Sequence, residues 1–245
     1  MKRIDPTDPR TIRYRFRRKR FKVVEAMIRQ VLSVRGEARV LDVGGRANYW
    51  AMLDRNLRDR VVITIVNYQS ELESHRGKED DLRLVCKHGD GCNLENYDEC
   101  SFDISHSNSV IEHVGSYSNM IRFSKETQRV GRGYYMQTPN FWFPLDPHYG
   151  VPFVHWLPDA LRISLHSSFN LGYARKTSYQ EALSRVDHCR MVDKRLIREL
   201  FSDGHVFSER YMFMAKSIIA IRWPEGRPPC SGRVPDRNGA SSQRQ

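Results

Sequence analysis

The chain of 245 residues is long enough for one large α/β domain or at most two small ones, and its 40% hydrophobic and 11% aromatic residues exclude global disorder. The net charge of +11 is concentrated near the N-terminus, where eight of the thirteen residues from 10 to 22 are basic. Such a cluster can attract phosphates or anionic lipid, but a solvated helix start or a flexible arm is the simpler interpretation.

The cysteines follow no metal-binding or disulfide pattern. Among the five, there is no C-x-x-C pair and no ligand-like spacing with histidine. An odd number at irregular spacing favours free thiols in a reducing cytosol, so we expect no metal site. The start MKRIDPTDPR lacks an apolar run behind its charges, and the longest apolar runs are far too short for a membrane span. We therefore expect a cytoplasmic protein without a signal peptide or transmembrane segment.

Secondary structure is predicted in chain order from hydrophobic periodicity. Residues 1–15 are polar and basic and predict a flexible arm, and apolar residues from 16 to 38 recur at three- and four-residue steps, which indicates a helix. We then expect strands at 39–43, 61–66, 82–86, 102–106 and 134–137, helices at 46–58, 120–130 and 194–201, and a closing pair of strands at 212–213 and 217–222. This alternation predicts an α/β fold with a mostly parallel sheet covered on both faces. Residues 16–223 form this domain, and the segment 224–245, rich in proline and glycine, predicts a disordered tail.

The loop after the first strand marks a ligand site. The stretch VLDVGGRANYW (40–50) passes from apolar residues through a glycine pair into helix-forming sequence. In a parallel sheet, ligands lie beyond the carboxyl ends of the strands, and glycine lets the backbone approach them. The loop has neither the G-x-G-x-x-G fingerprint of dinucleotide sites nor the Gly-Lys-Ser/Thr ending of a P-loop.

Three further segments narrow the choice of ligand: GDGCNLENYDECSFDISHSNSVIEHV (89–114), GRGYYMQTPNFWFPLDPHYGVPFVHWLP (131–158) and RELFSDGHVFSERYMFMAKSIIAIR (198–222). With the glycine loop, they make the chain from about residue 24 to 222 resemble the class I S-adenosylmethionine-dependent methyltransferases, specifically the methyltransferase type 11 branch of small-molecule enzymes. The resemblance implies a Rossmann-like three-layer sandwich whose seven-stranded, mostly parallel sheet has an antiparallel last strand. It also implies S-adenosyl-L-methionine as cofactor, lying across the ends of the first, second and fourth strands.

The resemblance assigns cofactor contacts residue by residue. It implies that Asp42 and the backbone of Gly44 and Gly45 contact the methionine part. Asp90 would accept a hydrogen bond from the adenine amino group, and the Gly91 N–H would reach a ring nitrogen.

The fourth and second strands supply the remaining implied contacts. Asn108 and Ser109 follow the fourth strand, where the family places backbone beside the sulfonium. The family usually ends the second strand with Asp or Glu, which binds both ribose hydroxyls, whereas this chain has Asn67. An amide can still pair with hydroxyls, so we expect Asn67 to bind the ribose at modest affinity, or else to cap a turn.

Two histidines are candidates for a general base, which methyl transfer needs only when the acceptor starts protonated. His113 and His148 have the right intrinsic pKa, with Asp146 and His155 behind them. We slightly favour His148, because the loop after the fifth strand commonly contacts the acceptor in this fold. His113 can instead make a structural hydrogen bond, and Glu112 is better explained by helix-start electrostatics than by catalysis.

The segment 141–158 is predicted to lie on the substrate side. Its aromatic residues stand among prolines, which pre-set the backbone. They can line an acceptor pocket, stack on a planar or sugar ring, contact a membrane interface peripherally, or form an extra packing layer.

Three functions remain open. The first is a methyltransferase acting on a small molecule, hydrophobic or lipid-linked in particular. The second is a nucleic-acid methyltransferase that uses the basic N-terminal arm, although SNSVIEH replaces the Asn-Pro-Pro-Tyr-type signature of base-amino methyltransferases. The third is a non-catalytic, methyltransferase-like interaction module.

Overall fold

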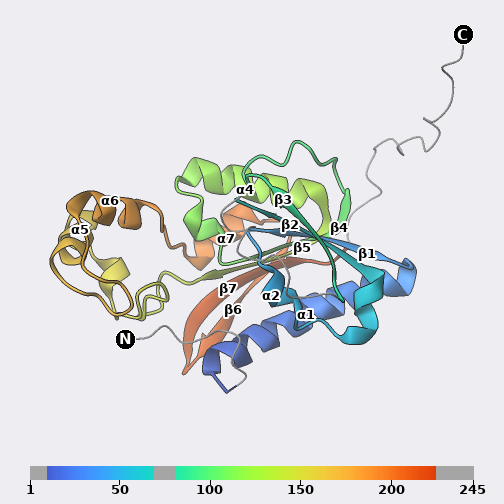
Figure 1. Cartoon of the computed structure of the whole chain (residues 1–245), viewed down its shortest axis with the longest axis horizontal. Helices are drawn as coiled ribbons and strands as arrows, with labels where there is room; N and C mark the ends of the chain where they lie inside the picture. The colour runs from blue at the N-terminus through green and yellow to red at the C-terminus, as the bar shows by residue number, and fades with distance from the viewer. Residues whose placement is uncertain (1–9, 69–80, 225–245) are drawn as a thin grey trace, which may run out of the picture.

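The computed structural model of the chain describes residues 10–68 and 81–224, and one seven-stranded sheet runs through them (Figure 1). The strands are β1 (Ala38–Val43), β2 (Val61–Asn67), β3 (Arg83–His88), β4 (Phe102–Asn108), β5 (Gly131–Pro139), β6 (His205–Tyr211) and β7 (Met214–Arg222). Their order is β3-β2-β1-β4-β5-β7-β6, with β1 to β5 parallel and β7 antiparallel to both of its neighbours. The predicted fold class, including its antiparallel last strand, is confirmed.

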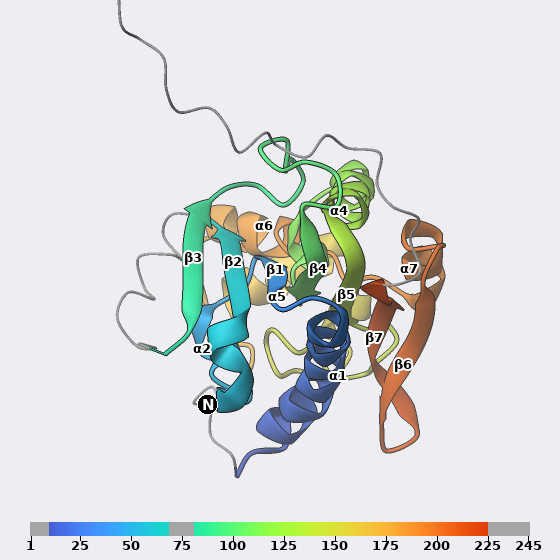
Figure 2. The ribbon, with the colours of Figure 1, turned by 90° about the vertical axis from the view of Figure 1, so that its right-hand side faces the viewer.

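Helices cover both faces of the sheet. They are α1 (Ile12–Val34), α2 (Ala47–Trp50), α4 (Tyr117–Val130), α5 (Asp159–Ser168), α6 (Tyr179–Asp187) and α7 (Lys194–Leu200), with short 3-10 turns η1 (Arg55–Arg60), η2 (Ile111–His113) and η3 (Val154–Trp156). In Figures 1 and 2, α1 and α4 lie on opposite sides of the sheet. On one side Phe21 and Ile28 of α1 are fully buried, and on the other side Phe123 of α4 packs with Ile197 of α7.

Helices α5 and α6 stand apart from these layers. They lie together beyond the end of the sheet in Figure 1 and pack around Ile163, Ala182 and Val186, a small cluster of their own. Neither helix was predicted from the sequence. We call residues 140–193, which connect β5 to α7 and contain both helices, the lobe.

Three predicted boundaries were wrong for identifiable reasons. The arm predicted for 1–15 ends sooner, because Thr11 caps α1 by accepting a hydrogen bond from the Tyr14 N–H at 3.1 Å. The helix predicted for 46–58 is two elements, since Asp54 caps η1. The strand predicted at 212–213 is a turn, in which Met212 and Phe213 have φ of 45° and 70°.

The remaining expectations concern the termini, the membrane and the thiols. Residues 1–9 of the predicted arm and 225–245 of the predicted tail lie outside the described residues. Within 10–68 and 81–224, no helix is long and apolar enough to cross a bilayer. Cys86, Cys92 and Cys189 are free thiols, as predicted, whereas Cys100 is disulfide-bonded. An odd total of cysteines leaves room for such a bond, so the count alone could not exclude it.

Candidate functional site

The glycine loop is clamped at the carboxyl ends of β1 and β2. Gly44 adopts φ of +70° and donates its N–H to the carbonyl oxygen of Val66 at 2.7 Å. A Cβ on Gly45 would lie 1.7 Å from Oδ2 of Asp42. The loop therefore folds back directly over Asp42, and only glycine fits there without displacing that carboxylate.

Asp42 is fully buried under the loop and both of its oxygens are used inside the protein. Oδ1 lies 2.6 Å from Nδ1 of His106, and Oδ2 accepts from Nε1 of Trp50 at 2.7 Å. These bonds fix the carboxylate and, through it, the glycine loop. The direct contact with the methionine part that the resemblance implies stays a prediction.

His106 is a site residue that was not predicted from the sequence. Its ring stacks on Tyr49 and on Tyr135, with centroids 4.9 and 5.6 Å apart, and it is 1% exposed. The signal was present in the run Ser105-His106-Ser107, since polar residues inside a buried parallel strand need a partner.

Asn67 ties the end of β2 to the same loop. Its Nδ2 donates to the carbonyl oxygen of Gly45 at 3.0 Å, and its Oδ1 accepts from the N–H of Tyr68 at 2.8 Å. This geometry is the turn-capping role that we set beside ribose binding. It leaves the amide one N–H and one lone pair for a ligand, so the ribose contact stays a prediction.

The loop after β3 meets the end of β1, as the cofactor assignment requires. A Cβ on Gly91 would lie 2.6 Å from Cγ1 of Val43. Asp90 shapes the turn, because its Oδ1 accepts from the N–H of Cys92 at 2.9 Å. Burial, with a smaller contribution from Asp90, raises the pKa of the Cys92 thiol to about 11.

The end of β4 carries a buried amide oxygen that can still accept a hydrogen bond. Oδ1 of Asn108 is buried and has no hydrogen-bond partner within the described part of the chain. Ser109, with φ of 59°, donates its N–H to the carbonyl oxygen of Gln137 at 2.8 Å, so its backbone donor is occupied. The unpaired amide oxygen beside a glycine loop fits a ligand with polar groups, as a nucleoside has.

The two histidines predicted as general bases, His113 after β4 and His148 after β5, lie next to each other. The rings of His113 and His148 are perpendicular, with centroids 5.0 Å apart. Asp146 accepts from the backbone N–H of His148 at 2.7 Å and lies 3.8 Å from Nδ1 of His155. Sγ of Cys189, a residue not predicted from the sequence, lies 3.4 Å from Nδ1 of His148.

The surroundings of His148 favour its charged form. Burial lowers its pKa, but hydrogen bonds with Asp146 and Cys189 outweigh burial and raise the pKa to about 10. Burial raises the pKa of the Cys189 thiol, against the influence of His148. Glu112 is fully buried rather than at an exposed helix start, and its Oε2 accepts from Oγ1 of Thr138 at 3.0 Å.

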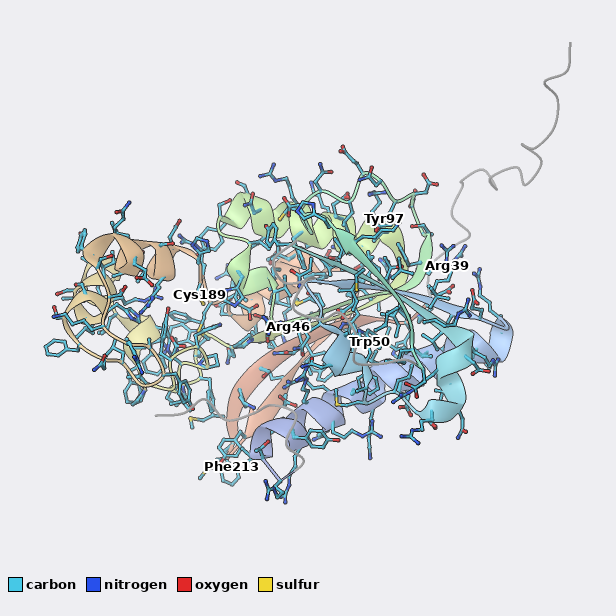
Figure 3. All side chains as sticks on the ribbon, in the orientation of Figure 1. Arg39, Arg46, Trp50, Tyr97, Cys189 and Phe213 are labelled. Carbon is cyan, nitrogen blue, oxygen red and sulfur yellow. The ribbon has the colours of Figure 1, made fainter. Side chains whose placement is uncertain are left out.

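The lobe presents apolar side chains to solvent. Its large hydrophobic residues that are at least one-third exposed are Trp142, Leu145, Phe153, Trp156, Leu157, Leu161, Phe169, Tyr179 and Leu183. A cavity of about 340 Å³ lies between α5 and α6, lined by Ile163, Leu183 and Val186 among others. Of the six aromatic rings in the predicted segment 141–158, those of Trp142, Phe153 and Trp156 are exposed, whereas that of Phe143 is buried. Figure 3 marks Cys189 where the lobe joins the sheet.

Comparison with known proteins agrees with this geometry. Residues 41–133 match the methyltransferase domain family. An uncharacterized protein of Mycobacterium tuberculosis, strain H37Rv, is 32% identical over 62 residues, which is 25% of this chain and 21% of that protein. The chain thus matches about one-fifth of the length of that relative.

Three solved structures share the fold. A Pyrococcus horikoshii protein superposes with a TM-score of 0.56 at 14% identity, covering 89% of this chain and 95% of that one. An S-adenosylmethionine-dependent methyltransferase from Methanosarcina mazei gives 0.51 at 13% identity, over 78% and 95% of the two chains. A putative sarcosine dimethylglycine methyltransferase from Galdieria sulphuraria gives 0.52 at 18% identity, over 84% and 69%. The predicted resemblance to class I methyltransferases is confirmed, and it implies S-adenosylmethionine as the cofactor.

Proposed function

We propose that the chain transfers a methyl group from S-adenosylmethionine to a small-molecule acceptor that is hydrophobic or lipid-linked. The observation that carries the acceptor class is the lobe, whose exposed aromatic and aliphatic residues follow directly after β5. Contiguous exposed apolar surface is uncommon on soluble proteins and marks binding sites. The same surface supports peripheral contact with a membrane, where a lipid-linked acceptor would reside.

The cofactor half of the proposal rests on the loops after β1, β2, β3 and β4. When bound, S-adenosylmethionine supplies a sulfonium methyl group that a nucleophile displaces in line. The glycine loop and the end of β2 would hold the methionine and ribose parts through Gly44, Gly45 and Asn67, with Asp42 positioning the loop from below. Asp90 and Gly91 would read the adenine, and Asn108 and Ser109 would lie beside the sulfonium.

The protein's main contribution to rate is alignment of the two reactants in a site shielded from water. Proximity of this kind can contribute about 7–11 kcal/mol to lowering the barrier. Where the acceptor is a hydroxyl, its proton would pass to His113, or to His148 in the uncharged form of that ring, with Asp146 orienting His148.

The basic cluster supports a small-molecule acceptor over a nucleic acid. Arg18 donates to the carbonyl oxygen of Met52 at 2.5 Å, and Arg20 pairs with Glu209 at 2.8 Å. Part of the cluster is therefore engaged inside the fold. A cytoplasmic location stays our prediction; the three free thiols favour it, whereas the disulfide-bonded Cys100 favours an oxidising compartment.

Transfer of label from methyl-labelled S-adenosylmethionine tests the proposal. The purified chain is incubated with cofactor and a host extract separated into aqueous, nucleic-acid and lipid fractions. We expect label in a metabolite of the lipid fraction or another apolar metabolite. Label in nucleic acid would favour the second function, and cofactor binding without any transfer would favour a non-catalytic module.

A further inference from the structure

Three side chains with metal-binding atoms meet where the lobe joins the sheet. His113 comes from η2, His148 from the loop after β5, and Cys189 from the segment after α6, and their ligand atoms all lie within 4.8 Å of one another. Sγ of Cys189 lies 3.4 and 3.6 Å from the two ring nitrogens of His148. Two ligands of a tetrahedral zinc ion are about 3.3–3.8 Å apart, given bonds of about 2.0–2.1 Å to nitrogen and about 2.3 Å to sulfur. The spacing of Cys189 and His148 already suits one ion.

Each histidine has one ring nitrogen held by a protein acceptor. Nδ1 of His113 lies 3.0 Å from the carbonyl oxygen of His188, and Nδ1 of His148 lies 3.2 Å from Oδ1 of Asp146. In the neutral rings, a proton on each Nδ1 satisfies these acceptors and leaves Nε2 with a lone pair, so His148 would release its second proton to solvent when it binds an ion. Histidines that bind metals are commonly oriented in this way, by a carbonyl or a carboxylate on the second nitrogen.

Backbone hydrogen bonds brace the segments that carry the three residues. The N–H of Arg190 donates to the carbonyl oxygen of Glu112 at 2.7 Å, which holds the Cys189 segment against η2. The N–H of Gly150 donates to the carbonyl oxygen of Asp146 at 2.8 Å, which closes the turn around His148. Ligands on segments braced in this way lose little freedom when an ion binds.

The charges around the cluster suit a dication. The Cys189 thiol interacts electrostatically with the carboxylates of Glu112 and Asp146. Glu112 is fully buried, and its Oε1 has no hydrogen-bond partner within residues 10–68 and 81–224. Buried negative charge is costly without a compensating cation, and a bound metal ion is the strongest local charge a site can hold.

We propose that His113, His148 and Cys189 bind one Zn²⁺ ion through two imidazole nitrogens and a thiolate. The N₂S donor set favours zinc over magnesium and calcium, which prefer oxygen ligands. Three protein ligands leave a fourth position for water or another small ligand, as in catalytic zinc sites.

Metal binding itself does not depend on the proposed methyltransferase function, but its use there would. A hydroxyl or thiol of the acceptor in the fourth position would lose its proton to solvent water more readily, because the ion lowers the pKa of its ligands. The zinc site would then take over the proton handling that the sequence assigned to the histidines, because the ion and the Nδ1 acceptors together occupy both ring nitrogens of His113 and His148.

Cobalt substitution tests the site without cofactor or acceptor. The full chain is stripped with a chelator, dialysed and titrated with Co²⁺, then with Zn²⁺ in competition. We expect one equivalent of Co²⁺, with visible bands of a tetrahedral ion, thiolate charge-transfer absorption, and loss of both when one equivalent of Zn²⁺ is added. Cys189→Ser should abolish the charge-transfer absorption and weaken binding at least 100-fold.

The controls separate this cluster from other thiols and histidines. His188→Gln changes a neighbouring side chain that lies outside the cluster and should bind the metal as the wild type does, whereas His148→Gln should not. A wild-type spectrum without charge-transfer absorption would overturn the proposal even where a variant fails to fold. Unchanged binding by Cys189→Ser would overturn it equally, and neither result would bear on methyl transfer.

Discussion

The predicted cofactor edge of the sheet and the lobe differ in what they bury. The cofactor edge buries hydrogen-bonded polar groups, whereas the lobe leaves apolar rings exposed. At the cofactor edge, Asp42 and Asn67 make internal hydrogen bonds that hold one glycine loop in place. In the lobe, apolar rings such as Trp142 and Phe169 face solvent, and the titratable groups gather where it joins the sheet. The contrast lies between a predicted cofactor edge that internal hydrogen bonds hold in place and a lobe that keeps apolar surface exposed.

The largest expected effect is a loss of stability, and it should differ between two carboxylates, Asp42 at the predicted cofactor edge and Asp159 in the lobe. Asp42→Ala removes a buried acceptor and leaves the Trp50 and His106 ring nitrogens without it, so we expect a loss of about 3–5 kcal/mol in the free energy of unfolding. Asp159→Ala, in the lobe, removes a half-buried ion pair, in which the Asp159 side chain is 67% exposed and the Arg162 side chain 10%, and should cost about 1 kcal/mol. Urea denaturation of both variants measures the difference, and equal losses would contradict it.

A second pair of variants tests how closely the glycine loop is packed. In Gly45→Ala the new methyl group overlaps the fixed Asp42 carboxylate, which should cost about 1–3 kcal/mol in the free energy of unfolding and weaken cofactor binding. Gly36→Ala is the matched control, because nothing lies within 4 Å of the added carbon. Thermal denaturation compares them. A Gly45→Ala variant as stable as Gly36→Ala would show that the loop is not constrained.

Substitutions of exposed residues in the lobe should change the affinity for the acceptor rather than the stability of the protein. Trp142 is 63% exposed, so Trp142→Ser should leave the melting temperature nearly unchanged and raise KM for an apolar acceptor about tenfold, through lost apolar contact. Phe213, 98% exposed at the tip of the β6–β7 hairpin in Figure 3, provides the control. If Phe213→Ser raises KM by the same factor, the lobe is not the acceptor surface.

The smallest effect concerns the unusual amide at the end of β2. Asn67→Ala removes one hydrogen bond to the loop and the predicted one to the ribose, so S-adenosylmethionine should bind about fivefold more weakly. Fluorescence or calorimetric titration measures this affinity. Unchanged affinity would leave Asn67 with turn capping alone.

Much of the fold followed from the sequence because its signals are local. Apolar runs such as Val61–Ile65 were enough to predict a mostly parallel sheet, whereas its antiparallel last strand was implied by the family resemblance and β6 was not predicted. Boundaries were wrong where one capping side chain decided them, as Thr11 and Asp54 did. Helices α5 and α6 were not predicted because they pack mainly on each other, around only three buried apolar residues.

The site was harder to predict, since its contacts join distant segments. Pairing of Asp42 with His106 spans 64 positions, and Cys189 lies 41 positions from His148. Spacing rules for metal ligands therefore gave no signal, and the sequence predicted no metal. His113 and His148 were selected one by one as bases, but their placement beside each other depends on the topology of β4 and β5.

Calorimetric titration of S-adenosylmethionine into wild-type protein, Gly36→Ala and Gly45→Ala tests the central claim most directly. If the loop after β1 cradles the cofactor, the wild type and Gly36→Ala bind one equivalent with the same affinity, and Gly45→Ala binds at least tenfold more weakly. An absence of binding to the folded wild type, or equal binding by all three proteins, would contradict the account.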